Sequence, residues 1–197
     1  MNAGLISEET VEAGTIRRVV KTGGSTKHVL FGLPKRFWNR GNARRMLRHA
    51  VALYDQLEVQ TVELEAMGLG KYIWAVAGFD FRDEETRELV NTAMQLFAAE
   101  LELFDGPLPE FDHSWDVLAL DYDQGGNPVY LEAERLEAVL SERGEVRLIE
   151  GFRPGRIALS KALLLYSRYD SWDGVLDLDP ESKSRSHLEL YLSERNR

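Results

Sequence analysis

The stretch from residue 34 to residue 81 decides the fold, and it reads PKRFWNRGNARRMLRHAVALYDQLEVQTVELEAMGLGKYIWAVAGFDF. Its first fifteen residues hold six Lys or Arg and no acid. Gly41 lies among them, directly before an amphipathic helix. Backbone N–H groups at the start of a helix have no partner inside it, and the helix dipole favours negative charge there. The stretch therefore predicts an anion-binding turn at Gly41 that opens into a helix.

Helical and strand-like spacing alternate along the same stretch. Asn42 is the expected N-cap, because its side chain can accept from a first-turn N–H. Apolar residues then recur at helical spacing, at Ala43, Met46, Leu47, Ala50, Tyr54 and Leu57. Residues 59–64 alternate as a half-buried strand does. A short helix over 71–77 follows, and we expect it to end at Gly78 in the left-handed conformation.

The flanking sequence adds further strands and helices. Two β-rich runs, 15–20 and 27–33, are separated by a glycine turn and predict a hairpin, with residues 1–13 as a lead-in arm. Downstream, the patterns predict a helix over 83–104, a boundary at 106–109, a strand over 115–120, a helix over 131–143 and a helical tail over 186–194. This order predicts an α/β (α+β) protein in which helices cover a sheet.

Composition narrows the function classes. The chain has 197 residues, about one domain or one domain with an appendage, and 44% of them are apolar. No run approaches the roughly 18 apolar residues of a membrane span, and no signal pattern opens the chain. There are no cysteines, and the four histidines lack metal-ligand spacing, so no metal site is predicted. A soluble, cytoplasmic protein without membrane partners is the default expectation.

Charge is distributed unevenly along the chain. Residues 1–57 hold ten Lys or Arg and four Asp or Glu, whereas residues 58–197 hold fourteen against twenty-nine. Nucleic acid is disfavoured as a partner, because the acidic remainder repels phosphate. A small, highly charged anion held near residues 40–48 fits the pattern better.

Residues 34–79 resemble the GNAT superfamily of N-acetyltransferases. That family carries a Gln/Arg-x-x-Gly-x-Gly/Ala loop from a strand into a helix, and residues 38–43 (WNRGNA) stand in that place. A strand ending near an alanine then follows in the family, here 62–66 (VELEA). A short helix closes in an aromatic-x-x-x-Gly-Phe motif, here 74–79 (WAVAGF). The resemblance covers the cofactor-binding half, about residues 15–81.

The resemblance implies a mixed, mostly antiparallel sheet flanked by helices. It implies an acyl-CoA-binding domain over 1–105 and an acidic C-terminal α/β extension over 106–197, which stands alone or completes the same domain. Acetyl-CoA, as co-substrate, is expected to place its pyrophosphate on the N–H groups of residues 40–44 and its pantetheine arm along residues 29–33. The cofactor-binding residues implied are Leu30, Phe31, Leu33, Arg36, Arg40, Gly41, Asn42, Ala43 and Arg44.

The implied activity is acyl-CoA-dependent N-acyl transfer to a small-molecule or protein amine. Such a reaction needs a base and an acid for the leaving thiolate, and Glu63 and Tyr72 are the candidates, with Glu65 and His28 nearby. The alternative interpretation of Glu63 and Glu65 is the solvated face of a strand. The acidic remainder of the chain suits a cationic acceptor.

Two departures from the family pattern leave other functions open. Trp74 stands where the family often has a tyrosine, and indole cannot act as an acid. Trp38 replaces a polar group of the loop. Both favour a non-catalytic GNAT-like module that binds a CoA-type ligand or serves in regulation. A third reading has the basic residues contact a protein or phosphate-bearing partner instead. A homodimer stays open under each of these hypotheses.

Overall fold

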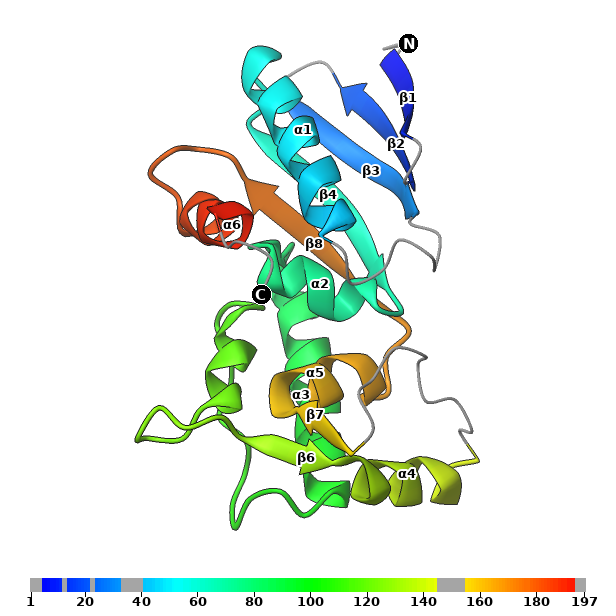
Figure 1. Cartoon of the computed structure of the whole chain (residues 1–197), viewed down its shortest axis with the longest axis vertical. Coiled ribbons are helices and arrows are strands. Elements are labelled where there is room, and N and C mark those ends of the chain that lie inside the picture. The colour runs from blue at the N-terminus through cyan, green and yellow to red at the C-terminus, as the bar shows by residue number, and fades with distance from the viewer. Residues whose placement is uncertain (1–4, 12–13, 22–23, 33–40, 145–154, 194–197) are drawn as a thin grey trace. The chain divides into compact units, whose positions relative to one another are not determined.

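The structure is a computed structural model that describes residues 5–11, 14–21, 24–32, 41–144 and 155–193 (Figure 1). The chain forms two compact units. The first comprises residues 1–65, 76–82 and 173–197, and the second comprises residues 66–75 and 83–172. The chain therefore crosses between the units several times.

A six-stranded, mostly antiparallel sheet organises the first unit, and the fold class predicted from the sequence is confirmed. In spatial order its strands are β1 (Leu5–Val11), β2 (Gly14–Lys21), β3 (Ser25–Gly32), β4 (Thr61–Met67), β8 (Ser171–Asp177) and β5 (Asp80–Phe81). Strands β1, β2 and β3 form an antiparallel meander, β3 and β4 are parallel, and β5 and β8 are antiparallel. Helices flank this sheet.

The lead-in arm expected over residues 1–13 is corrected by the structure. Residues 5–11 form β1, which pairs with β2 from Leu5↔Val20 to Val11↔Gly14. These two strands are consecutive in the chain and antiparallel, which is the arrangement of a hairpin. The predicted hairpin of β2 and β3 is confirmed.

Helix α1 (Asn42–Gln56) supplies much of the core of the first unit. One stripe of the helix is buried, at Met46, Leu47, Ala50, Val51 and Tyr54, as helical spacing predicted. The buried side of β4 meets the same core through alternate residues, because successive side chains of a strand point to opposite faces. Helix α6 (Lys183–Ser193) completes this unit and contacts α1.

The second unit is mainly helical. Its elements are α2 (Gly70–Val76), α3 (Glu84–Glu100), the 3-10 helix η2 (Asp116–Asp121), β6 (Tyr130–Glu132), α4 (Ala133–Glu142), β7 (Arg156–Ala158) and α5 (Leu159–Tyr166).

Asp83 caps α3, because its carboxylate accepts from the Thr86 N–H at 2.9 Å. Buried Asn91 on α3 donates to the carbonyl of Phe111 and accepts from its N–H, both at 3.0 Å. These bonds join residues on the two sides of the expected boundary at 106–109.

The strand predicted over residues 115–120 is wrong. Residues 116–121 form the 3-10 helix η2, with the Leu118 N–H donating to the Trp115 carbonyl at 3.0 Å. The carboxylate of Asp116 accepts from the His113 N–H at 2.9 Å and holds the entry to this turn. An apolar run of this length fits a strand or a helical turn equally, and local hydrogen bonds decided between them.

Candidate functional site

Helix α1 begins at a left-handed glycine. Gly41 is the N-cap residue, with φ 69° and ψ 8°, and its carbonyl accepts from the Arg45 N–H at 3.0 Å. The expected N-cap, Asn42, is instead the first helical residue, and it is buried. The glycine occupies this position because side chains other than glycine rarely adopt a positive φ. The N-cap assignment from the sequence is therefore corrected by one residue.

The first turn of α1 has the electrostatics of an anion site. The N–H groups of Asn42, Ala43 and Arg44 lie in the first turn, where an α-helix offers them no carbonyl. No acidic side chain stands in this turn to neutralise the positive end of the helix dipole. The side-chain oxygen of buried Asn42 accepts a hydrogen bond from the Arg45 guanidinium, which holds this arginine near the turn. The backbone of this turn can therefore bind an anion.

The arginines of α1 contact helix α6. The Arg44 guanidinium lies over the ring of Tyr191, 4.6 Å from its centroid. Arg48 donates to the backbone carbonyl of Leu192, near the C-terminal end of α6. Cations next to the last carbonyls of a helix are favoured by its dipole. The basic face of α1, predicted from sequence as an anion site, thus also packs a neighbouring helix.

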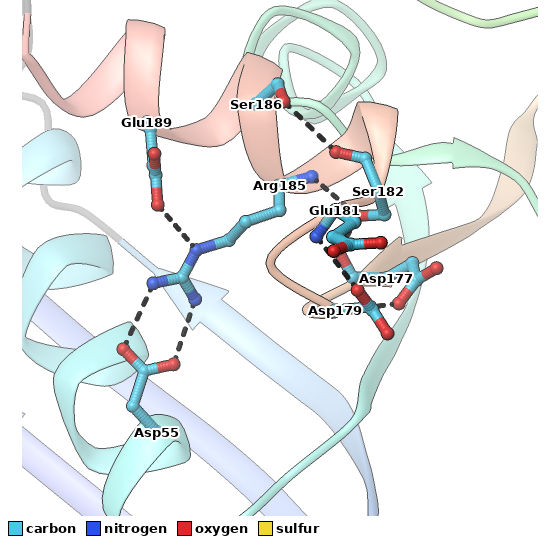
Figure 2. Close-up of polar contacts among 8 residues, drawn as sticks. All are labelled: Asp55, Asp177, Asp179, Glu181, Ser182, Arg185, Ser186 and Glu189. Atoms are coloured by element: carbon cyan, nitrogen blue, oxygen red, sulfur yellow. Dashed lines mark hydrogen bonds and ion pairs between the residues drawn. The ribbon is translucent and has the colours of Figure 1, made fainter.

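Figure 2 shows the polar contacts that hold α6 against α1. The Arg185 guanidinium binds both carboxylate oxygens of Asp55 on α1, at 2.9 and 3.2 Å, and a Glu189 oxygen at 2.9 Å (Figure 2). Hydrogen bonding to Asp55 raises the pKa of Arg185 above its usual range. A bidentate ion pair of this kind orients both helices, because both donors and both acceptors must align.

The same figure shows how α6 begins. The Ser182 hydroxyl accepts from the Arg185 N–H at 3.0 Å, as an N-cap does. Before it, the Asp177 and Asp179 carboxylates accept backbone N–H bonds at 2.9 and 2.8 Å (Figure 2). The start of α6, and with it the placement of Arg185, is therefore set by local hydrogen bonds.

The parallel strands β3 and β4 pair over only part of their length. Their register runs from Ser25↔Thr61 to His28↔Leu64, and β3 continues to Gly32. Leu30 and Phe31, two predicted cofactor-binding residues, lie on this continuing part of β3. Within the described residues, the side of β3 that faces β4 thus loses its register partners after His28. Leu33, Arg36 and Arg40 lie outside the described residues.

His28 belongs to the core. It is buried, and its Nε2 hydrogen-bonds with the hydroxyl of Tyr54 on α1. The ring of Phe79 lies 6.3 Å away, centroid to centroid. A buried side chain that ties β3 to α1 in this way fits packing better than base catalysis.

Glu63 and Glu65 lie on the face of β4 opposite its buried residues. Glu63 is half-buried and stands opposite Lys27 of β3, and Glu65 is exposed. Opposite charges at neighbouring positions of a sheet stabilise the pairing modestly. Glu63 is therefore accessible for a proton transfer, and it also fits the solvated-face interpretation.

Tyr72, the candidate acid, lies on α2 in the second unit. It is half-buried, and the Lys161 ammonium of α5 lies 5.6 Å from its ring centroid. Burial lowers the pKa of Lys161. Trp74, which replaces the tyrosine of the family motif, is buried.

Sequence reasoning missed several polar contacts that join distant segments. The Arg185–Asp55 pair spans 130 residues, and no local pattern signals it. Buried Lys71 donates to the Tyr169 carbonyl at 2.9 Å and lies 4.2 Å from the centroid of that ring. The weak signal for Lys71 is its place among apolar residues of a helix, where a lysine needs a partner.

No metal or membrane site was found in the described parts of the chain. Among residues 5–11, 14–21, 24–32, 41–144 and 155–193, no three His, Asp or Glu side chains come together as a metal would require. None of the described helices is long and apolar enough to cross a membrane.

Comparison of the chain with models of known protein families, with curated proteins and with solved structures finds no match. The assignment of a function consequently depends on the geometry described above and on the sequence resemblance.

Proposed function

We propose that the first unit binds acyl-CoA and that the protein transfers the acyl group to an amine. The observation that carries this proposal is the incomplete pairing of β3 and β4, two parallel strands joined through the Gly41 turn and α1. Backbone N–H and C=O groups left without a neighbouring strand can pair with an extended ligand. The pantetheine arm of CoA is such a ligand, because it carries two amides along a chain.

The start of α1 supports the same proposal. Its left-handed glycine and acid-free first turn suit a pyrophosphate, which would accept from the N–H groups of Asn42, Ala43 and Arg44. Arg45 is exposed at this turn and adds positive charge. The side chain of Arg44 is engaged with Tyr191, so we assign its contribution to the backbone N–H.

The residues of the chain would serve acyl transfer in distinct ways. The amine nitrogen forms a bond to the acyl carbon as the carbon–sulfur bond breaks. N–H groups of β3 beyond His28, where the described part of β4 gives no register partner, would stabilise the oxygen as it gains negative charge. Glu63 of the first unit is the candidate to take the amine proton. Tyr72, the acid expected from the sequence, belongs to the second unit and is assigned no part in this site.

A second candidate function is a CoA-binding module without turnover. The buried Trp74, in the place of the proton-donating tyrosine of the family motif, favours it. The two functions share the binding step and differ in whether the thioester is consumed.

The binding step is tested by thermal melting with and without acetyl-CoA. At about a hundred times its dissociation constant, a ligand stabilises the folded protein by about 2.7 kcal/mol. Arg45→Glu reverses a charge at the first turn of α1. If this weakens the affinity for acetyl-CoA tenfold, the ligand would stabilise the variant by only about 1.4 kcal/mol at the same concentration. Lys183→Glu is the matched control, because it makes the same charge change at an exposed position of α6.

Each outcome has a defined meaning. A shift that shrinks in Arg45→Glu and persists in Lys183→Glu supports binding at the start of α1. No shift in the parent protein refutes the proposal. Release of free thiol from acetyl-CoA in a panel of amines then separates the enzyme from the binding module.

A further inference from the structure

Residues 121–130 of the second unit form a narrow ribbon. The chain turns back on itself, with the Asp123 N–H donating to the Asn127 carbonyl at 2.9 Å and the Val129 N–H donating to the Asp121 carbonyl at 2.7 Å. Tyr122 and Pro128 pair between these bonds in an antiparallel bridge. In Figure 1 this segment projects as a loop before the chain enters β6.

Side-chain hydrogen bonds support the turn and the base of the ribbon. The Asp123 carboxylate accepts from the backbone N–H groups of Gly125 and Asn127, both at 2.8 Å, and from the Asn127 side chain. These bonds hold the pKa of Asp123 below its usual range, so it stays ionised. At the base of the ribbon, the Asp121 carboxylate accepts from the Ser160 N–H at 2.8 Å and from the Ser160 hydroxyl at 2.6 Å, which anchors it to α5.

One face of the ribbon presents two exposed tyrosine rings. Tyr122 and Pro128 occupy paired positions, and paired positions of antiparallel strands place their side chains on the same face. Tyr130 lies two residues beyond Pro128 and returns to that face. Tyr122 is 61% exposed and Tyr130 is 51% exposed. We call Tyr122, Pro128 and Tyr130 the tyrosine face.

The surrounding sequence is strongly acidic. Residues 101–142 hold eleven Asp or Glu and a single basic residue, Arg135. Arg135 donates to the Glu102 carbonyl at 3.0 Å and lies near its carboxylate, so its charge is partly compensated locally. Arg156 of β7, the strand paired with β6, forms an ion pair with Glu132 at 3.1 Å, so its charge is also compensated locally. The excess of acidic residues in this stretch attracts cations and repels phosphate.

We propose that the tyrosine face is a docking surface for an arginine- or lysine-rich segment of another protein. Guanidinium groups stack on tyrosine rings, and the acidic surroundings attract the same groups. Tyrosine suits this role because its large ring loses little conformational freedom on binding. The proposal is independent of acyl transfer, because every residue that carries it lies in the second unit.

The test uses the full-length protein and a fluorescein-labelled peptide of alternating arginine and glycine, followed by fluorescence anisotropy. The control peptide replaces each arginine with citrulline, which keeps the shape and removes the charge. We expect the arginine peptide to bind more tightly, and higher salt to weaken it. Tyr122→Ala and Tyr130→Ala should each weaken binding about threefold, and the double variant about tenfold, as exposed cation–π contacts predict.

Two further variants keep the test specific. The double variant Tyr122→Phe and Tyr130→Phe retains both rings and should bind as the parent protein does. Leu96→Ala truncates a side chain of the second unit that is 63% exposed and should leave binding unchanged. Equal binding of the double alanine variant and the parent protein would overturn the proposal, since it would show attraction to acidic charge alone. If the citrulline peptide binds as tightly as the arginine peptide, the proposal of a cationic partner is overturned.

Discussion

Replacing Gly78 with alanine tests how α6 packs against the turn that follows α2. Gly78 has φ 89°, the left-handed conformation expected from the sequence at the end of that helix. A Cβ atom at this position would lie 2.7 Å from the Ser184 carbonyl oxygen and 3.0 Å from both the His187 Cβ and the Leu188 nitrogen. Two of these three atoms belong to the backbone of α6, so the helix itself would have to move.

Two costs add in this variant. A residue other than glycine in the left-handed conformation costs about 1–2 kcal/mol. Forcing an extra methyl group into a packed region costs about 1–3 kcal/mol more. Gly78→Ala should therefore lower the free energy of unfolding by about 2–5 kcal/mol, a large fraction of the stability of a small protein.

Gly144→Ala is the matched control. Gly144 follows α4 as Gly78 follows α2, with φ 72°, and a Cβ there would meet no atom within 4 Å. It should show the conformational cost alone, about 1–2 kcal/mol. Urea unfolding gives both values from the shift in midpoint, provided that the slope is unchanged.

The difference between the two variants isolates the packing of α6. If Gly78→Ala destabilises the protein no more than Gly144→Ala does, α6 does not lie against Gly78 and the described packing is incorrect. A change in the dependence of the unfolding free energy on urea concentration would instead indicate that the two compact units unfold separately. Each variant would then be compared with the parent protein in the transition of the unit that carries the substitution.

Two further predictions concern the second unit. Asn91→Ala leaves the buried N–H and carbonyl of Phe111 without their side-chain partner and should cost about 2–5 kcal/mol in urea unfolding, whereas exposed Thr92→Ala should change stability by less than about 0.5 kcal/mol. Burial raises the pKa of the Asp121 carboxyl group above its usual 3.8, so the folded state binds the carboxyl proton more tightly than the unfolded state does. The protonated carboxyl group therefore adds to the free energy of unfolding at low pH, and this contribution is lost as the pH rises through the raised pKa. Asp121→Asn should remove that part of the pH dependence, and unfolding free energies that fall just as steeply in the variant would contradict this assignment.

Local chemistry accounts for the elements that the sequence predicted well. The apolar spacing from Met46 to Tyr54 predicts α1, and the alternation along β4 predicts a half-buried strand, because each pattern matches the period of its element. Gly78 in the left-handed conformation followed from the chemistry of helix ends. These features depend on neighbours within a few residues.

The candidate site was only partly predictable. Gly41 as the residue that opens α1 follows from the sequence, although Asn42 was expected to cap the helix. The buried position of His28 beside Tyr54 could not be foreseen, because the two residues are 26 positions apart and meet only when β3 packs against α1. Predicted acyl-CoA contacts stay a prediction until binding is measured.

The sequence by itself determined the periodic elements, the glycine turns and the separation of charge, because helix and strand periods and backbone preferences act locally. Tertiary structure decided which distant groups meet. It placed Arg185 on Asp55 and Lys71 against Tyr169, and it ended the pairing of β3 and β4 at His28. The physical reason is that burial and hydrogen bonding between distant segments outweigh local propensities of a few tenths of a kcal/mol.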